Sequence, residues 1–284
     1  MRIYNVMGYA CLVLYSAASM ALAPAQIGPW AGLAVGLSYL IACWFFAGLY
    51  LSCVIHMGIA HRALDYKEWF IQSLTLFNNA LGVYIDPVSW VNRHRLHHRF
   101  ADHAGDPNKL ASDGFWRTLW LCLFPYQTDV NIANDAILRT WPMRLAAHPL
   151  FLVVTQAGNF ALLWLLVGDV AFATVLWVGT RVFALWVNMV QNYWTHDRRW
   201  GYRRYADEDN AMNIADWLPV TATFSACLQN NHHHSPAFLR LSHTDAEYDL
   251  GFITVKAMKK LGLVKASNFG AVLPKDIPLA RLDF

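Results

Sequence analysis

The sequence predicts an all-α integral membrane protein with four transmembrane helices and a cytosolic helical cap. Of its 284 residues, 56% are hydrophobic and only 14% are charged, and the mean hydropathy is +0.28. Soluble domains carry about 25% charged residues. Several uncharged stretches also reach the length of about 20 residues that crosses a hydrocarbon core as a helix. The net charge of +3 is too small to indicate a nucleic-acid partner.

Four long apolar stretches supply the predicted spans, at residues 6–23, 27–55, 149–168 and 170–194. The first could pass for a signal peptide, but a second apolar stretch follows at once, which favours a retained span. The second is longer than a span requires, so His56 is expected at or beyond the cytoplasmic interface. Residues 69–85 and 118–126 are expected to form interfacial or buried helices. The chain is expected to be one domain, 1–284, with residues 56–148 and 195–284 as its cap.

Basic residues fall almost entirely on one side of the predicted spans: Arg62, Arg93, Arg95, Arg99, Arg198, Arg199, Arg203 and Arg204, with lysines near the C-terminus. Cytoplasmic loops are enriched in such residues, so both termini and every histidine cluster are expected in the cytoplasm, at the inner or plasma membrane if the source is bacterial. Arg181 is the exception because it lies inside the last span. A structural role is expected there, with a buried acid or carbonyl groups as partners.

The five cysteines are scattered, and no two of them form a CxxC pair. This argues against a disulfide framework, a zinc ribbon and a fused rubredoxin or ferredoxin module. No GxGxxG motif follows a plausible strand, so no dinucleotide-binding domain is expected. If the protein is a redox enzyme, its electrons come from another protein.

The stretch from His94 to His98 is the most informative part of the chain. If it is helical, His94, His97 and His98 lie three and four residues apart and project from one face. His97 and His98 diverge by about 100°, so this face could serve two neighbouring metal ions. The alternative is a polar surface helix that is rich in histidine.

A second pair, His56 and His61, is separated by five residues. On an α-helix this spacing rotates the two side chains apart by about 140°. The pair is therefore expected to serve different ions, unless a helix end lies between its members.

Two more clusters follow. Asn192 and His196 lie four residues apart, and QNNHH repeats the central spacing with Gln229 in place of the first histidine. Eight histidines then have ligand spacing: His56, His61, His94, His97, His98, His196, His232 and His233. A structural zinc ion takes four ligands, so eight indicate two ions. Imidazole-only coordination suits iron, copper or zinc, and the Glu-x-x-His signature of carboxylate-bridged di-iron bundles is missing.

The motifs HMGIAH, HRLHH and QNNHH, with NYWTH before the last, resemble the histidine boxes of the membrane fatty acid desaturases, especially the acyl-CoA desaturase branch. The resemblance covers residues 55–264 and includes Trp90, Gly105-Asp106-Pro107, Gly114-Phe115-Trp116, Glu247-Tyr248-Asp249 and Leu261-Gly262-Leu263. It implies a mushroom-like fold in which two irons are held by histidines from the second and fourth helices and from the cap. His196 matches the family's extra ligand before the last box, and Asn192 matches an asparagine that holds a metal-bound water.

The resemblance also implies a reaction. Hydrogens would be removed from two adjacent methylenes of an acyl chain in a tunnel, with O2 as co-substrate and electrons from a ferredoxin, rubredoxin or cytochrome b5-type protein. The substrate would be an acyl-CoA or an acyl-lipid within membrane lipid. A hydroxylase or ketolase on the same scaffold is one alternative. A membrane metal transporter or sensor is another, although transport sites lie near the bilayer midplane.

Gln229 departs from the acyl-CoA branch, which has histidine at this place and Gly-Glu-Gly-Trp where this chain has Ser225-Ala226-Cys227-Leu228. A glutamine resembles the last box of the front-end desaturases, so the substrate branch stays open and Gln229 is a further candidate ligand. A register that uses His233 and His234 as ligands is an alternative to His232 and His233.

The residues around the boxes receive weaker predictions. Asp102 and Asp106 are expected either to accept hydrogen bonds from ligand imidazoles or to cap loops. Four bulky residues are candidates for lining the substrate tunnel: Tyr39, Trp44, Phe45 and Trp90. Three histidines without a partner at ligand spacing are expected at the surface or in supporting roles: His103, His148 and His243.

Overall fold

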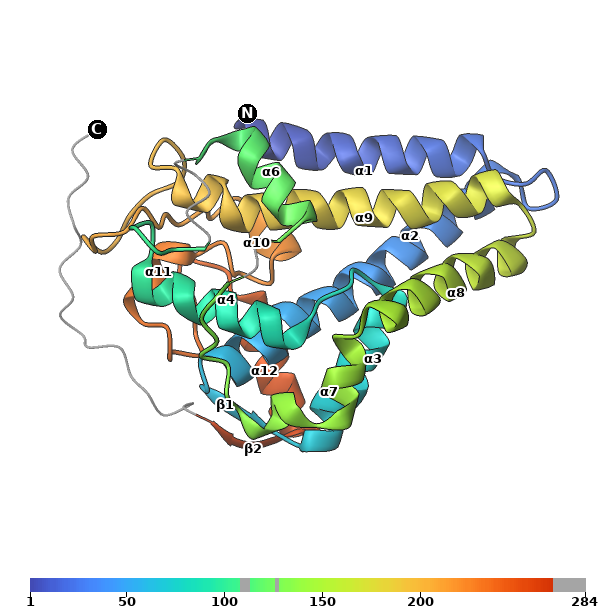
Figure 1. Ribbon diagram of the computed structural model, residues 1–284. Coiled ribbons are helices and arrows are strands. Elements are labelled where there is room, and N and C mark those ends of the chain that lie inside the picture. The colour runs from blue at the N-terminus through green and yellow to red at the C-terminus, as the bar shows by residue number, and fades with distance from the viewer. Residues whose placement is uncertain (108–112, 126–127, 268–284) are drawn as a thin grey trace.

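The computed structural model describes residues 1–107, 113–125 and 128–267. This part of the chain contains four helices that are long and apolar enough to cross a membrane (Figure 1). They are α1 (Ile3–Ala21), α2 (Gly28–Gly48) continued by η1 (Leu49–Ala60), α8 (Pro149–Val167), and α9 (Val170–Asn192) followed by η3 (Trp194–His196). The predicted number of apolar helices is therefore confirmed. The predicted cap segments at residues 108–112, 126–127 and 268–284 lie outside the described residues.

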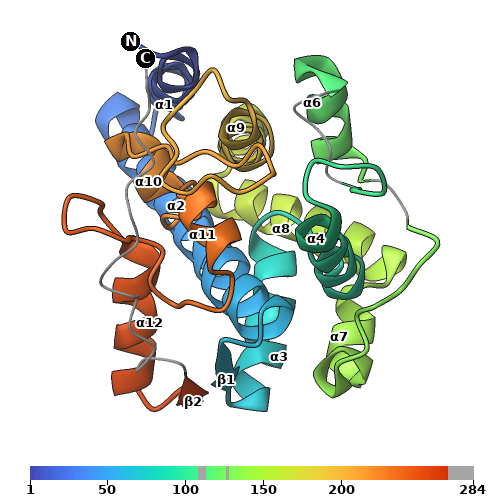
Figure 2. The ribbon, with the colours of Figure 1, turned by 90° about the vertical axis from the view of Figure 1, so that its left-hand side faces the viewer.

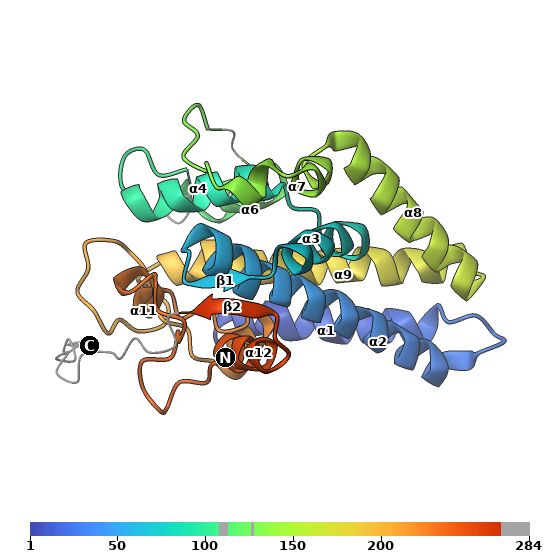
Figure 3. The same cartoon turned by 90° about the horizontal axis from the view of Figure 1, so that it is seen from below.

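The shorter elements gather toward the end of the long helices where the N-terminus lies, away from the loops that join α1 to α2 and α8 to α9 (Figures 1 and 2). They are β1 (Leu64–Tyr66), α3 (Glu68–Leu81), α4 (Pro87–Phe100), α6 (Phe115–Leu123), η2 (Ala136–Arg139), α7 (Trp141–Ala146), α10 (Trp217–Ala222), α11 (Gln229–His234), α12 (Leu250–Lys260) and β2 (Val264–Ser267). α3 and α6 are too short to span a membrane. The two strands pair antiparallel (Figure 3), a small sheet that the all-α prediction missed.

Side-chain caps fix where the important helices begin. The Asp86 carboxylate accepts hydrogen bonds from the backbone N–H groups of Val88 and Ser89, and Pro87 takes the first helical position of α4. Asp169 caps α9 through Phe172 N at 2.8 Å. α4 and α9 both carry predicted ligands near their C-terminal ends. By fixing where each helix begins, the caps help to fix where along the helix axis these ligands lie.

Aromatic rings resting on glycines hold α1, α2 and α9 together. The Tyr15 ring lies so close to Gly179 that a Cβ there would approach it to 2.1 Å. The Tyr15 hydroxyl also donates to the Gly36 carbonyl at 2.8 Å. Small residues at such positions let helices approach closely in a membrane, where van der Waals packing replaces the hydrophobic effect.

Arg181, in the middle of α9, binds neutral groups in the part of the chain that the structure describes. Its guanidinium donates to the carbonyls of Leu81 and Gly82 at 3.3 Å and to Gln156 Oε1 at 2.9 Å. It also lies over the Trp177 ring, 4.2 Å from the centroid. The carbonyls belong to the C-terminal end of α3, whose partial negative charge favours a cation. Carbonyl groups are therefore the partners of this arginine, the second of the two predicted possibilities.

Replacing Arg181 with Met should lower the unfolding temperature in detergent, because the carbonyls at the end of α3 lose their buried donor. The expected loss is about 1–3 kcal/mol of unfolding free energy. Arg199→Met is the matched control, because the Arg199 side chain is largely exposed and pairs with Asp197 at the surface. Equal effects of the two substitutions would contradict this role of Arg181.

Candidate metal centre

Eight histidines converge where η1, α4, η3 and α11 meet. They form two groups, and within each group one ring nitrogen per histidine lies within 4.8 Å of all the others. The first group is His56, His61, His94, His98 and His232, and the second is His97, His196 and His233. The groups adjoin each other, since the rings of His98 and His233 are 4.5 Å apart. The structure thus brings together all eight histidines that the sequence singled out.

His56 and His61 fall in the same group because the second long helix changes its winding. From Leu49 to Ala60 it is a π-helix, in which backbone bonds run between residues five apart. The His61 N–H continues this pattern by donating to the His56 carbonyl at 3.0 Å. A side chain five residues further on therefore returns to the same face. The sequence left two possibilities, different ions or a helix end between the two histidines, and the structure shows the second, because η1 ends at Ala60.

α4 divides its three histidines between the groups. His94 and His98 are four residues apart and face the first group, while His97 faces the second. The Trp90 ring stacks on His94 at 4.8 Å with an angle of 11° between the planes, which fixes the orientation of that imidazole. The spacing predicted that this face could serve two ions, and the structure shows that the pair four residues apart stays together.

α11 sends consecutive histidines to different places. His232 joins the first group and His233 the second, while His234 points away from both. The His234 ring stacks on Tyr205 at 3.7 Å and bonds to Asp207 at 3.2 Å. Gln229, one turn earlier, is buried, and its Oε1 has no hydrogen-bond partner among the described residues. A buried oxygen without a donor is compatible with a cation or a water as its partner.

Three carboxylates bond to the Nδ1 atoms of the second group. The pairs are Asp106 with His97 (2.9 Å), Asp102 with His196 (3.0 Å) and Asp209 with His233 (2.9 Å). Both roles expected for Asp102 and Asp106 are present, because Asp106 also accepts from the backbone N–H of Asp102 at 2.7 Å and Asp102 accepts from that of Asn210 at 2.8 Å. Asp209 was missed, because it precedes His233 by 24 residues and no fixed spacing marks it.

The histidine nitrogens that face one another fit a metal centre. An imidazole that donates through Nδ1 presents a lone pair at Nε2, and His97 and His233 hold these atoms 3.2 Å apart. In the first group His232 Nε2 lies 2.9 Å from that of His56 and 3.0 Å from that of His98. Lone pairs at these distances repel unless a proton or a cation lies between them. A set made of imidazoles suits iron, copper or zinc.

The two asparagines of QNNHH hold α11 in place, a role that the sequence did not reveal. Asn230 Oδ1 accepts from the backbone N–H of Arg204 and Tyr205 at 2.7 and 2.8 Å. Asn231 Nδ2 donates to Glu247 Oε2 at 3.0 Å. Glu247 also accepts from the Arg204 side chain at 2.9 Å, so one buried carboxylate joins α11 to two loops.

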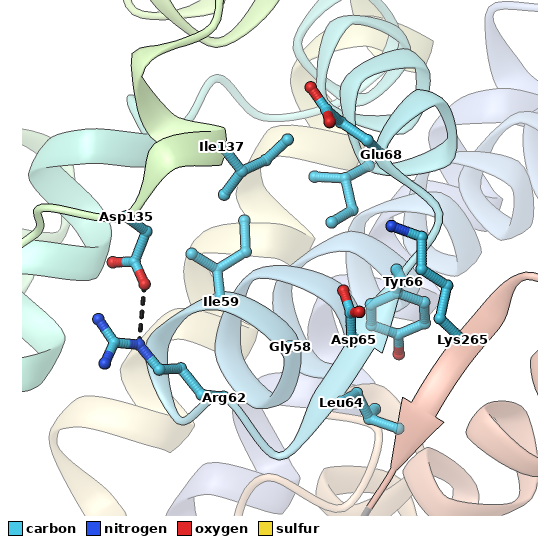
Figure 4. Close-up of a pocket in the computed structure, with 11 residues that line it drawn as sticks. Gly58, Ile59, Arg62, Leu64, Asp65, Tyr66, Glu68, Asp135, Ile137 and Lys265 are labelled. Carbon is cyan, nitrogen blue, oxygen red and sulfur yellow. Dashed lines mark hydrogen bonds and ion pairs between the residues drawn. The ribbon is translucent and has the colours of Figure 1, made fainter.

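Arg95 ties α4 to the end of the π-helix. Its guanidinium donates to the carbonyls of Ile59 and Ala60 at 2.8 and 3.0 Å and pairs with Asp135 at 2.6 Å. Asp135 also pairs with Arg62 at 2.9 Å, at the edge of a surface cleft of about 270 Å³ (Figure 4). No predicted ligand is among the described residues that line this cleft, so it is separate from the histidine groups.

The tunnel candidates do not form one surface. Trp90 lies against His94, whereas the Trp44 indole donates to a carbonyl of α10 at 3.1 Å. Tyr39 joins the Arg181 network through its hydroxyl, at 3.2 Å from the guanidinium. Phe45 is 40% exposed, and its ring lies 6.2 Å from that of the buried Phe224, which the Trp44 ring also contacts. Among the four, only Trp90 borders the histidines in the described structure.

The remaining polar candidates lie outside both groups. Asn192 donates from Nδ2 to the Asn188 carbonyl at 2.9 Å and also bonds to the Asn188 side chain. His103 is exposed, His148 caps α8, and His243 bonds to a tyrosine hydroxyl at 2.7 Å. The structure therefore places the three unpaired histidines at the surface or in supporting contacts.

Five histidines of the two groups have a pKa well below the usual value near 6.5. The main cause is burial, and the neighbouring imidazoles lower the pKa further. The five are His61, His94, His98, His232 and His233. The unfolded chain then binds more protons than the folded chain below about pH 6.5, so the stability of metal-free protein should fall as the pH drops from about 7 to 5. Thermal unfolding of chelator-treated protein measures this. His103→Gln should keep the same slope, because His103 is exposed, and a flat profile in the unmodified protein would contradict the prediction.

Comparison with known proteins agrees with this site. A family model described as fatty acid desaturase matches residues 10–247. The sn-1 stearoyl-lipid 9-desaturase of Anabaena variabilis is 30% identical over 263 residues, covering 89% of each chain. Delta-9 acyl-lipid desaturase 2 of Arabidopsis thaliana is 28% identical over 222 residues, covering 76% of this chain and 69% of the relative. Hex-5-enoyl-(acyl-carrier protein) acetylenase of Moorena producens is 25% identical over 255 residues, covering 81% and 76%. The chain therefore belongs to the fatty acid desaturase family of oxidoreductases.

Proposed function

We propose that this protein introduces a double bond into a fatty acyl chain carried on a membrane lipid, using O2 at a histidine-held di-iron centre. The observation that carries the proposal is the meeting of eight imidazoles from four distant segments in two adjoining groups. Family membership supports the reaction class.

The ligands proposed for the two irons are the eight histidines of the two groups. Gln229 Oε1 is a further ligand, and Asn192 acts through a water. Two irons bound there would supply the site at which O2 is reduced. The chain's own residues orient the imidazoles: Trp90 stacks on His94, and Arg95 anchors the end of the π-helix. Buried ligands also exclude bulk water, which protects reactive species from side reactions.

The acyl chain must be positioned by the protein, because its methylenes are chemically alike and geometry alone selects the pair that reacts. Trp90 is the proposed wall nearest to the metals. Tyr39, Trp44 and Phe45 are kept as more distant tunnel candidates on α2. These three residues make their contacts away from the histidines. We therefore propose that they limit the length of the bound acyl chain and do not touch the metals.

An acyl-lipid is the proposed substrate class, in preference to an acyl-CoA. Relatives named as stearoyl-lipid and acyl-lipid desaturases support this choice, and their names favour carbon 9 as the position of the double bond. Gln229 in the last box supports it too, because the sequence differs there from the acyl-CoA branch. Electrons are proposed to come from a separate ferredoxin, rubredoxin or cytochrome b5-type protein.

The proposed membrane placement makes the chain one domain with a cytosolic cap. Exposed tryptophans on the shorter helices support an interfacial position for them: Trp116, Trp120, Trp141 and Trp217. The excess of arginine near the histidine segments supports a cytoplasmic location for the cap and both termini. In a bacterium this would be the inner or plasma membrane.

Expression in a host that supplies iron and an electron donor should yield a new monounsaturated acyl-lipid, detected by mass spectrometry of the lipid fraction. His232→Ala should abolish the product, because His232 makes two of the short ring-nitrogen contacts of the first group, to His56 and to His98. His103→Ala should keep it. If iron-loaded protein with a working electron donor gives no product, the proposal is contradicted. A product heavier by oxygen would favour a hydroxylase, and metal uptake by vesicles without a lipid product would favour a transporter.

A further inference from the structure

The two histidine groups are supported in different ways. Every imidazole of the second group donates through Nδ1 to a carboxylate, from Asp102, Asp106 or Asp209. In the part of the chain that the structure describes, none of the five imidazoles of the first group bonds to a carboxylate. Their supports are instead neutral.

Neutral contacts are visible around the first group. His56 bonds to the backbone of Ser52, and Trp90 stacks on His94. His232 Nδ1 is buried without a hydrogen-bond partner among the described residues. Among the described residues, His56 and His94 are therefore oriented by neutral contacts, one with the backbone and one with an aromatic ring.

Asp209 is built into the second group from several directions. It is buried, accepts from His233 Nδ1 at 2.9 Å and accepts from the Ala211 N–H at 3.0 Å. Arg203 lies 3.6 Å from Asp209 Oδ1, the oxygen that accepts from Ala211. The contacts with Ala211 and Arg203 fix the carboxylate. Its bond to His233 therefore fixes the tautomer and the direction of that ring.

We propose that Asp209 is a positioning residue for a metal site at the second group, and that this site can be emptied independently of the first. The inference rests on the proposed metal centre. A carboxylate behind a ligating imidazole raises its basicity and holds its tautomer, and removing such a group lowers metal affinity about 10–100-fold. Among the described residues, three carboxylates bond to the imidazoles of one site and none to those of the other, so the loss of one carboxylate should affect one ion.

The chain offers a matched control two residues away. Asp207 lies in the same loop and bonds to the neighbouring His234, but this pair is about one third exposed and outside both groups. Asp207→Asn therefore removes the same kind of hydrogen bond without touching a proposed ligand.

The test counts iron in purified full-length protein that is loaded anaerobically with Fe(II) and then dialysed against a competing chelator. The unmodified protein and Asp207→Asn should retain two irons per chain and give two Mössbauer signals with ⁵⁷Fe. Asp209→Asn should retain one iron and one signal, with the affinity of the lost site reduced about 10–100-fold. Asp209→Glu should recover part of the second signal, which a purely structural defect would not predict.

Retention of both irons by Asp209→Asn at unchanged affinity would overturn the inference, and so would simultaneous loss of both. If Asp209→Asn does not fold, as judged by size exclusion and thermal unfolding, Asp106→Asn is read in the same way through His97. An unmodified protein that binds no iron would contradict the proposed function itself. The two failures are therefore distinguishable.

Discussion

The structure depends on holding several imidazole nitrogens against one another inside the protein. Ring nitrogens of the two groups lie 2.8–3.2 Å apart, although neutral imidazoles gain nothing from such an approach unless a cation or proton lies between them. Burial adds to the cost, because it removes the water that would otherwise solvate each nitrogen. The surrounding scaffold must therefore prevent the histidines from moving apart, and many polar contacts of the protein serve this end.

Those contacts come from residues that need not touch a metal. Arg95 fastens the end of the π-helix to α4, and Asn231 fastens α11 to the buried Glu247. Arg181 makes a comparable link deeper in the molecule, where it joins α9 to the end of α3. Each link joins segments that are distant in sequence, so the geometry of the histidines is a property of the whole fold.

The sequence predicted the parts of this arrangement that depend on local spacing. Four apolar helices and the division of α4 between two groups follow from hydropathy and from a period of 3.6 residues. A helix end between His56 and His61 was one of the two predicted arrangements, but the π-helix before it was not predicted, because the sequence carries no clear signal of a change from an α-helix to a π-helix. Asp209 and the β1–β2 pair were missed for another reason: each depends on a contact between segments far apart in the chain.

α11 ends in three consecutive histidines, and two of them bond to aspartates of a single loop. A slip of α11 by one residue would put His234 where His233 belongs and still find a carboxylate nearby, so histidine–aspartate chemistry alone does not choose between the two registers. Asn231 makes the choice, because the same slip would put His232 where the Asn231 amide donates to Glu247. Asn230 does not distinguish the two registers, since Asn231 would take its place. Asn231, which has no proposed ligand role, thus keeps α11 in the alignment that places His232 and His233 in the two groups.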